Sequence, residues 1–180
     1  MSALPRPAPG FDQPLALLEA CHDRIESRCV LLLRLVDHLE KQGLDEDARL
    51  AARQILSYFD DAGVKHHQDE EQDLFPVLLE TAGEAREALE RLIDGLREDH
   101  RRMERLWAEI REPLAAIRDG NGAELVRDLA LRFQALYLPH IEREERELLP
   151  AAARLLTAEQ IRRLGASMAA RRGLRLAPEE

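Results

Sequence analysis

The chain has 180 residues, 45% of them hydrophobic, which is enough to bury the core of a single domain. Charged residues make up 34% and aromatic residues only 4%, a composition that favours helices over strands and predicts an all-α protein. The formal net charge of -9 and the lack of a basic tract exclude a nucleic-acid partner, and no apolar run approaches the ~20 residues needed to cross a membrane.

The N-terminal residues 1–11 are rich in proline and predict a loose arm without the apolar segment of a secretion signal. Cys21 and Cys29 are the only cysteines, and on one helix they would lie about 12 Å apart along its axis, too far for a disulfide. Free thiols suit a reducing compartment, so we expect a cytoplasmic protein. Cys29 falls in an apolar stripe and is expected in the core, whereas Cys21 is expected on the helix surface.

A first helix is predicted from Asp12 and Pro14, which are typical of a helix start, to Gly43. Its apolar side chains recur at alternating spacings of three and four residues, and one histidine, His22, lies in that row. The predicted inward-facing residues are Leu15, Leu18, His22, Ile25, Cys29, Leu32, Val36 and Leu39. His22 should therefore be buried.

A second helix should begin near Asp45, and Pro76 is expected to kink it or end it. The apolar row and the match with His140 both select His66 as the inward-facing residue, and the adjacent His67 shares its face with the polar residues Asp60 and Glu71. We therefore expect His66 to point inward and His67 to lie at the rim. The predicted inward-facing row is Ile55, Phe59, Ala62, His66, Glu70, Leu74 and Val77.

A third helix is predicted from about Glu84, with Pro113 bending its end, and residues 119–122 form the clearest loop. A fourth helix follows this loop. Both helices carry a histidine in an otherwise apolar row, His100 in the third and His140 in the fourth.

Long helices joined by short turns predict an up-down-up-down four-helix bundle over residues 12–156. A capping box from Thr157 to Gln160 predicts a short fifth helix that ends near Arg171 and lies against the bundle. Residues 157–180 are thus expected to form a short C-terminal helix and a tail.

The pattern H-x3-E-E-x2-L-[F/L]-P occurs twice, in the second and fourth predicted helices. Residues four apart lie on the same helix face, so His66 is expected beside Glu70, and His140 beside Glu144. Two such pairs that face each other could hold two metal ions.

A shorter pattern, H-x3-E, precedes each copy by roughly forty residues, as His22-x3-Glu26 and His100-x3-Glu104, so the chain reads as two helical hairpins of one design. A single histidine on an apolar face is usually a core residue with a hydrogen bond. A buried carboxylate, however, costs several kcal/mol unless a cation is near, and neutral imidazoles cannot neutralise the two motif glutamates. Together these groups predict bound metal.

With these motifs, residues 12–156 resemble the hemerythrin-like (HHE cation-binding) proteins, whose four-helix bundle holds a non-haem di-iron centre. The resemblance implies two iron ions bridged by the two motif glutamates, with zinc or manganese as substitutes. It also implies that His22 and His66 bind one ion and the other two histidines the second, or a crossed arrangement of these. The implied metal ligands are His22, His66, Glu70, His100, His140 and Glu144.

The chain departs from the oxygen-carrying hemerythrins, which have H-x3-H in the third helix and H-x4-D in the fourth. Here the third helix has His100-x3-Glu104 and the fourth His140-x3-Glu144, so the fifth histidine of the carriers is absent. This set is more similar to the HHE proteins linked to iron–sulfur repair, nitric oxide handling and iron homeostasis.

We therefore expect a di-iron protein that binds or senses O2, NO or peroxide, or that handles iron. The alternative is a di-iron oxidoreductase of the peroxidase, NO reductase or iron-centre repair type, and a metal-free helical interaction module is a third reading. The sequence leaves open whether Glu26, Glu104 or His67 also binds metal. It also leaves open the native metal and the oligomeric state.

Overall fold

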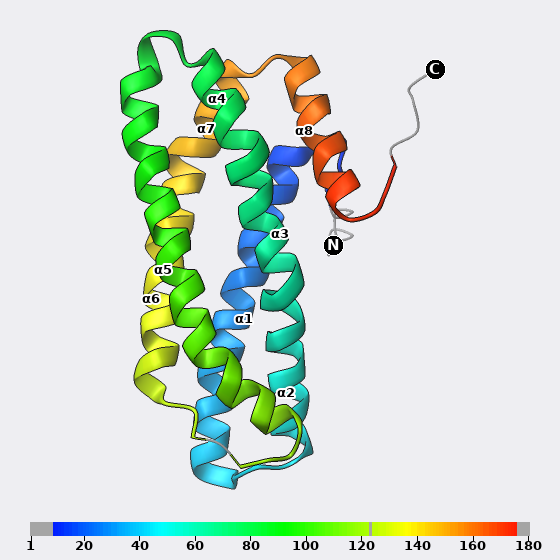
Figure 1. Ribbon diagram of the computed structural model, residues 1–180, viewed down its shortest axis with the longest axis vertical. Helices are drawn as coiled ribbons and strands as arrows, with labels where there is room; N and C mark the ends of the chain where they lie inside the picture. The colour runs from blue at the N-terminus through cyan, green and yellow to red at the C-terminus, as the bar shows by residue number, and fades with distance from the viewer. Residues whose placement is uncertain (1–8, 123, 176–180) are drawn as a thin grey trace, which may run out of the picture.

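The fold of the protein is given by a computed structural model that describes residues 9–122 and 124–175 (Figure 1). All regular structure in these two ranges is helical, which confirms the predicted all-α class. Four long helical segments run up-down-up-down, and each packs against two neighbours.

The first segment is α1 (Pro14–Gln42), and the second runs through α2 (Glu46–Ser57), α3 (Gly63–Gln68) and α4 (Phe75–Thr81). The third is α5 (Arg86–Arg118), and the fourth runs through α6 (Arg127–Arg143) and α7 (Leu149–Leu155).

The helix starts follow the capping residues in the sequence. The Asp45 carboxylate accepts a backbone N–H of the first turn of α2, as predicted. The predicted capping box is present at the start of the last helix, α8 (Ala158–Arg171), where Thr157 and Gln160 satisfy each other's backbone N–H groups. In α1 the residue before the first helical turn is Gln13, not the predicted Asp12.

The second segment does not end at Pro76, contrary to one of the predicted outcomes. It continues to Thr81 because a wide π-helical turn, η2 (Asp69–Leu74), precedes the proline, and the Phe75 N–H bonds the Glu70 carbonyl five residues back. The proline then occupies the first turn of α4, where its missing N–H costs little. The fourth segment passes Pro150 in the same way after η4 (Glu144–Leu148).

The π-helical turns also keep the inward-facing row straight. An α-helix repeats every 3.6 residues, so each spacing of four residues overshoots a full turn by about 40°. The wider turns η2 and η1 (Tyr58–Ala62) absorb this drift in the second segment. His66, Glu70 and Leu74 are therefore all buried, and this row continues with the buried Leu78 rather than with the predicted Val77.

Two apolar clusters lie at different heights in the bundle, and the histidines lie between them. In α1, Leu18 belongs to one cluster and Ile25 to the other, with His22 between. In α5, His100 likewise separates the two clusters. Polar side chains at this level are shielded from water by apolar layers on both sides.

The helix α8 covers one side of the bundle, where it contacts α1 and η2 (Figure 1). Cys21 lies on the covered face of α1 and is only 7% exposed, so its predicted surface position is wrong, while Cys29 is in the core as predicted. The residues before α1 also pack here: a Cβ at Gly165 would lie 1.9 Å from the Phe11 carbonyl oxygen, so only glycine permits this contact.

The ends of the chain are described in part. Most of the predicted arm, residues 1–8, lies outside the described residues, as does the end of the predicted tail, residues 176–180. Within the described part of the chain, none of the helices combines the length and the apolar character needed to cross a membrane.

Candidate metal centre

The structure brings all six of the predicted ligand residues together at one level of the bundle. Each of the four long segments contributes one histidine, and the glutamates come from the π-helical turns η2 and η4. All six side chains are buried, with exposed fractions of 4% or less. They are His22, His66, Glu70, His100, His140 and Glu144.

The six residues form two groups that share both glutamates. In the first group, ligand atoms of His22, His66, Glu70 and Glu144 all lie within 4.8 Å of one another. The second group replaces the two histidines with His100 and His140 and meets the same limit. Two carboxylates common to two pairs of imidazoles form the arrangement expected around two bridged cations.

The inner nitrogens of the imidazoles face the carboxylates at short distances. In the first group, His22 Nε2 lies 3.2 Å from a Glu144 oxygen, and His66 Nε2 lies 3.5 Å from a Glu70 oxygen. In the second group, His100 Nε2 lies 3.5 Å from a Glu70 oxygen, and His140 Nε2 lies 3.0 Å from a Glu144 oxygen. Each glutamate therefore faces one histidine of each group.

These contacts do not satisfy the buried carboxylates. None of the oxygens of Glu70 and Glu144 makes a hydrogen bond of normal geometry with any described residue. Two inner nitrogens, those of His100 and His140, even face each other at 3.1 Å. Unpaired buried polar atoms are costly, and atoms that converge without bonding one another fit a shared cation. The residues therefore suit metal ions.

Protons balance the buried charges when no metal is present. Burial, together with the Glu144 carboxylate, raises the pKa of Glu70 well above its usual range. Burial also acts on Glu144, but the neighbouring His140 and His22 hold the pKa of that carboxyl well below its usual range. For His140, burial is outweighed by Glu144 and Asp99, which raise its pKa to about 9. Metal binding would have to displace such protons.

A second layer of carboxylates holds the outer nitrogens of two of the four histidines. Glu145 accepts a hydrogen bond from His22 Nδ1 at 3.0 Å, and Glu71 accepts one from His100 Nδ1 at 2.7 Å. Such partners fix the orientation of a ligating imidazole. Sequence reasoning missed both, although the second glutamate of each E-E pair was a visible signal. It named instead Glu26 and Glu104, which are exposed.

His67 is half-buried, whereas His66 is buried, and His67 lines a pocket that also includes the polar residues Gln68 and Gln72. Its ring stacks on that of His100, with centroids 3.9 Å apart and planes 16° apart. A ligand atom of His67 lies within 4.8 Å of those of His100 and His140. Because a bundle helix touches two neighbours, a residue beside the inward-facing row can still reach the edge of the centre.

Comparison with known proteins agrees with this geometry. A model of the family described as hemerythrin HHE cation binding domain matches residues 13–152. A protein of Haemophilus influenzae (strain Rd), described as an uncharacterized protein, is 32% identical over 162 residues, which span 90% of this chain and 91% of that protein. The match reaches into all four long helical segments and includes all six buried residues of the centre. The chain thus belongs to the hemerythrin HHE cation-binding family.

Proposed function

We propose that the protein binds two iron ions side by side at this centre and there binds or senses a small molecule such as O2, NO or peroxide, or handles the iron itself. The observation that carries the proposal is the sharing of Glu70 and Glu144 by the two groups of histidines. A single metal position would need only one pair of imidazoles. Two positions with two common carboxylates use all six of the buried residues that converge at the centre.

The donor atoms support iron. Imidazole nitrogens and carboxylate oxygens without a thiolate suit iron, manganese or zinc, and paired carboxylates between two positions suit a dinuclear iron centre in a helical bundle. Bound there, iron would supply open coordination positions and reversible oxidation. The protein's own part is to orient the imidazoles through Glu71 and Glu145 and to exclude water with the apolar clusters on either side.

Iron content tests the proposal. Metal-free protein reconstituted with ferrous iron under anaerobic conditions should retain two irons per chain, measured with a colorimetric chelator. Because each carboxylate serves both positions, Glu70→Gln or Glu144→Gln should lower retention at both. The matched control is Glu26→Gln, which changes an exposed glutamate four residues after His22. Retention of a single iron by the unaltered chain would contradict the dinuclear centre.

An enzymatic role is the second candidate, and one separate observation favours it. A pocket of about 280 Å³ reaches His100 from the surface, so a substrate larger than a diatomic molecule has room beside the centre. Turnover assays of the iron-loaded protein with peroxide and with NO separate an enzyme from a binding protein. Binding without turnover would support the first role.

A further inference from the structure

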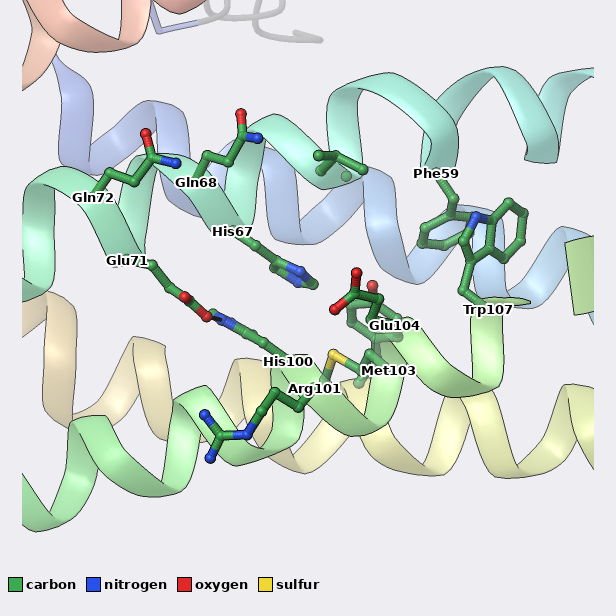
Figure 2. A pocket seen from close by; sticks show the side chains of 13 residues that line it. Phe59, His67, Gln68, Glu71, Gln72, His100, Arg101, Met103, Glu104 and Trp107 are labelled. Atoms are coloured by element: carbon green, nitrogen blue, oxygen red, sulfur yellow. Dashed lines mark hydrogen bonds and ion pairs between the residues drawn. The ribbon is translucent and has the colours of Figure 1, made fainter. Parts of the chain in front are cut away.

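One pocket gives the metal centre a connection to the surface, and it opens between α3 and α5 (Figure 2). Figure 2 shows His67 reaching into it from one wall and His100 from the other. Of the four histidines assigned to the metals, His100 alone lines this pocket. The pocket therefore approaches one of the two metal positions, the position of His100 and His140.

The lining of the pocket combines polar residues with an apolar wall. Gln68, Gln72 and Glu104 are polar lining residues, whereas Phe59, Met103 and Trp107 form an apolar wall. At about 30 Å³ per water molecule, the volume of about 280 Å³ holds several waters or a small solute. A lining of this kind admits a small molecule with one polar end.

His67 has a polar atom that the protein leaves unpaired. Its Nε2 is buried and makes no hydrogen bond to any residue that the structure describes. A ring nitrogen of the same residue lies within 4.8 Å of ring nitrogens of His100 and His140. A buried nitrogen without a partner costs free energy, so a partner from outside the protein is expected at this place.

The stacking of the rings argues against His67 as a third imidazole ligand of the same ion. A metal ion lies close to the plane of each imidazole that binds it, because the nitrogen lone pair lies in the ring plane. The rings of His67 and His100 are almost parallel, 16° apart, and stacked at 3.9 Å. An ion in the plane of His100 is therefore displaced from the plane of His67.

His67 also breaks the symmetry of the two hairpins. The residue after His66 in the first motif is His67, and the residue after His140 in the second is the buried Ile141. The two halves are otherwise matched in their six inner residues and in the outer carboxylates Glu71 and Glu145. The unpaired imidazole is thus present on one side of the centre.

We propose that a small molecule of two or three heavy atoms enters through this pocket, binds at the metal position of His100 and His140, and accepts a hydrogen bond from His67 Nε2. The proposal rests on the proposed function, because it needs metal at that position. It adds two details to that function. The ligand is assigned to one of the two metal positions, which the repeated motifs alone do not distinguish, and His67 is named as the residue that recognises it.

The first test replaces His67 with the residue found at the matching place in the second hairpin. His67→Ile should keep the iron content of the unaltered protein, because the assigned ligands remain. Azide, used as the probe on the oxidised, iron-loaded protein, should bind about tenfold more weakly, the loss expected for one hydrogen bond. The control is His38→Ile, which removes a histidine that pairs with Asp45 far from the pocket.

The second test narrows the entrance without touching the centre. Val64 lines the pocket and is 45% exposed, so Val64→Trp should slow the association of azide while iron content stays the same. Val30→Trp changes a valine on α1 that is 48% exposed and does not line the pocket, and it should leave the rate unchanged.

The outcomes separate this proposal from the proposed function. An unaltered protein that retains no iron would overturn both. Where iron is retained, an unchanged azide affinity in His67→Ile would overturn the hydrogen bond from His67, and an unchanged rate in Val64→Trp would overturn the entry route. Neither result would touch the proposed function. Loss of iron in His67→Ile, with His38→Ile unaffected, would show that His67 is a metal ligand and would also overturn the assignment.

Discussion

The two glutamates of each E-E pair face different parts of the centre. Glu70 and Glu144 point at the shared metal positions, while Glu71 and Glu145 hold the outer nitrogens of histidines that come from the other hairpin. Every helical hairpin therefore orients an imidazole of its partner. The two adjacent glutamates have separate roles. The first faces the metal positions, and the second accepts a hydrogen bond from the outer nitrogen of a histidine and so fixes the orientation of its ring.

Removing the charge of an outer glutamate should weaken iron binding. Glu145→Gln and Glu71→Gln keep the size of the side chain but lose the charged acceptor of His22 Nδ1 and His100 Nδ1, respectively. We expect iron affinity to fall by about 10- to 100-fold in each, measured by competition with a chelator.

The control for both substitutions lies in the same π-helical turn as Glu145. Glu147 is exposed, and Glu147→Gln should leave iron affinity within error of the unaltered protein. Equal affinities in all three variants would mean that the outer carboxylates do not orient the histidines.

At this scale the sequence predicted the inner residues better than their surroundings. The spacing of four between His66 and Glu70 determines that they share a face, whatever the neighbouring helices do. The position of His67 depends on which helix crosses beside it, and spacing within one helix carries no information on that. Cys21 was misplaced for the same reason, because α8 covers a face that the pattern of α1 leaves polar.

The helix α8 is joined to the turn that carries Glu70. Asp69, the residue before Glu70, is fully buried and forms ion pairs with Arg171 and, at 2.7 Å, with Arg172. Asp73 in the same turn accepts a hydrogen bond from Ser167 at 2.8 Å. The C-terminal helix therefore fixes the position of η2 from outside the four-helix bundle.

Breaking these ion pairs should destabilise the protein. Asp69→Asn removes the buried carboxylate that both arginines share, although Arg171 keeps its pair with Asp73. Loss of one partner of a buried ion pair costs about 3–5 kcal/mol. Because both arginines are partly exposed, we expect about 2–3 kcal/mol, measured by urea unfolding of the metal-free protein.

A matched substitution distinguishes this effect from a general loss of charge. Glu87→Gln breaks the exposed pair with Arg91, whose side chains are 85% and 68% exposed, and should change stability by less than about 1 kcal/mol. Similar losses of unfolding free energy in both variants would show that the buried ion pairs of Asp69 stabilise the protein no more than an exposed pair does.

At the scale of helices, the sequence predicted the number and order of the elements but not their internal turns. Apolar periodicity, the helix start near Asp45 and the capping box at Thr157 depend on local residues, and the last two predictions were confirmed. The π-helical turns arise because inward-facing residues spaced by four must stay in one row, which is a demand of the whole bundle. Pro76 was therefore expected to kink the helix or to end it, and nothing in the sequence indicated that the preceding turn accommodates the proline.

For the whole molecule, the centre joins all four long segments, so metal should stabilise the fold. A cation that binds only the folded protein adds about 2.7 kcal/mol per position when its free concentration is one hundred times the dissociation constant. For a chain of this size, the contribution of each metal position corresponds to a rise of roughly 5–10 °C in Tm. Scanning calorimetry of iron-loaded and metal-free protein measures it.

The same scan on a variant with impaired binding provides the control. Glu144→Gln removes a carboxylate common to both groups, so added iron should raise its Tm much less than that of the unaltered protein. An identical midpoint in the loaded and metal-free forms of the unaltered protein would mean that the two apolar clusters hold the bundle together without help from the centre.

The histidine–glutamate contacts that cross between the two hairpins bear on how such a chain can arise. His22 of the first hairpin contacts the glutamates of the second, and His100 of the second contacts those of the first, so neither hairpin alone completes a metal position. Two copies of one half-length chain, related by a two-fold axis, would supply the same inner residues as a homodimer. Fusion of the copies into one chain then permits what a homodimer cannot have. In a dimer every substitution appears twice, whereas here His67 faces one side of the centre and Ile141 the other.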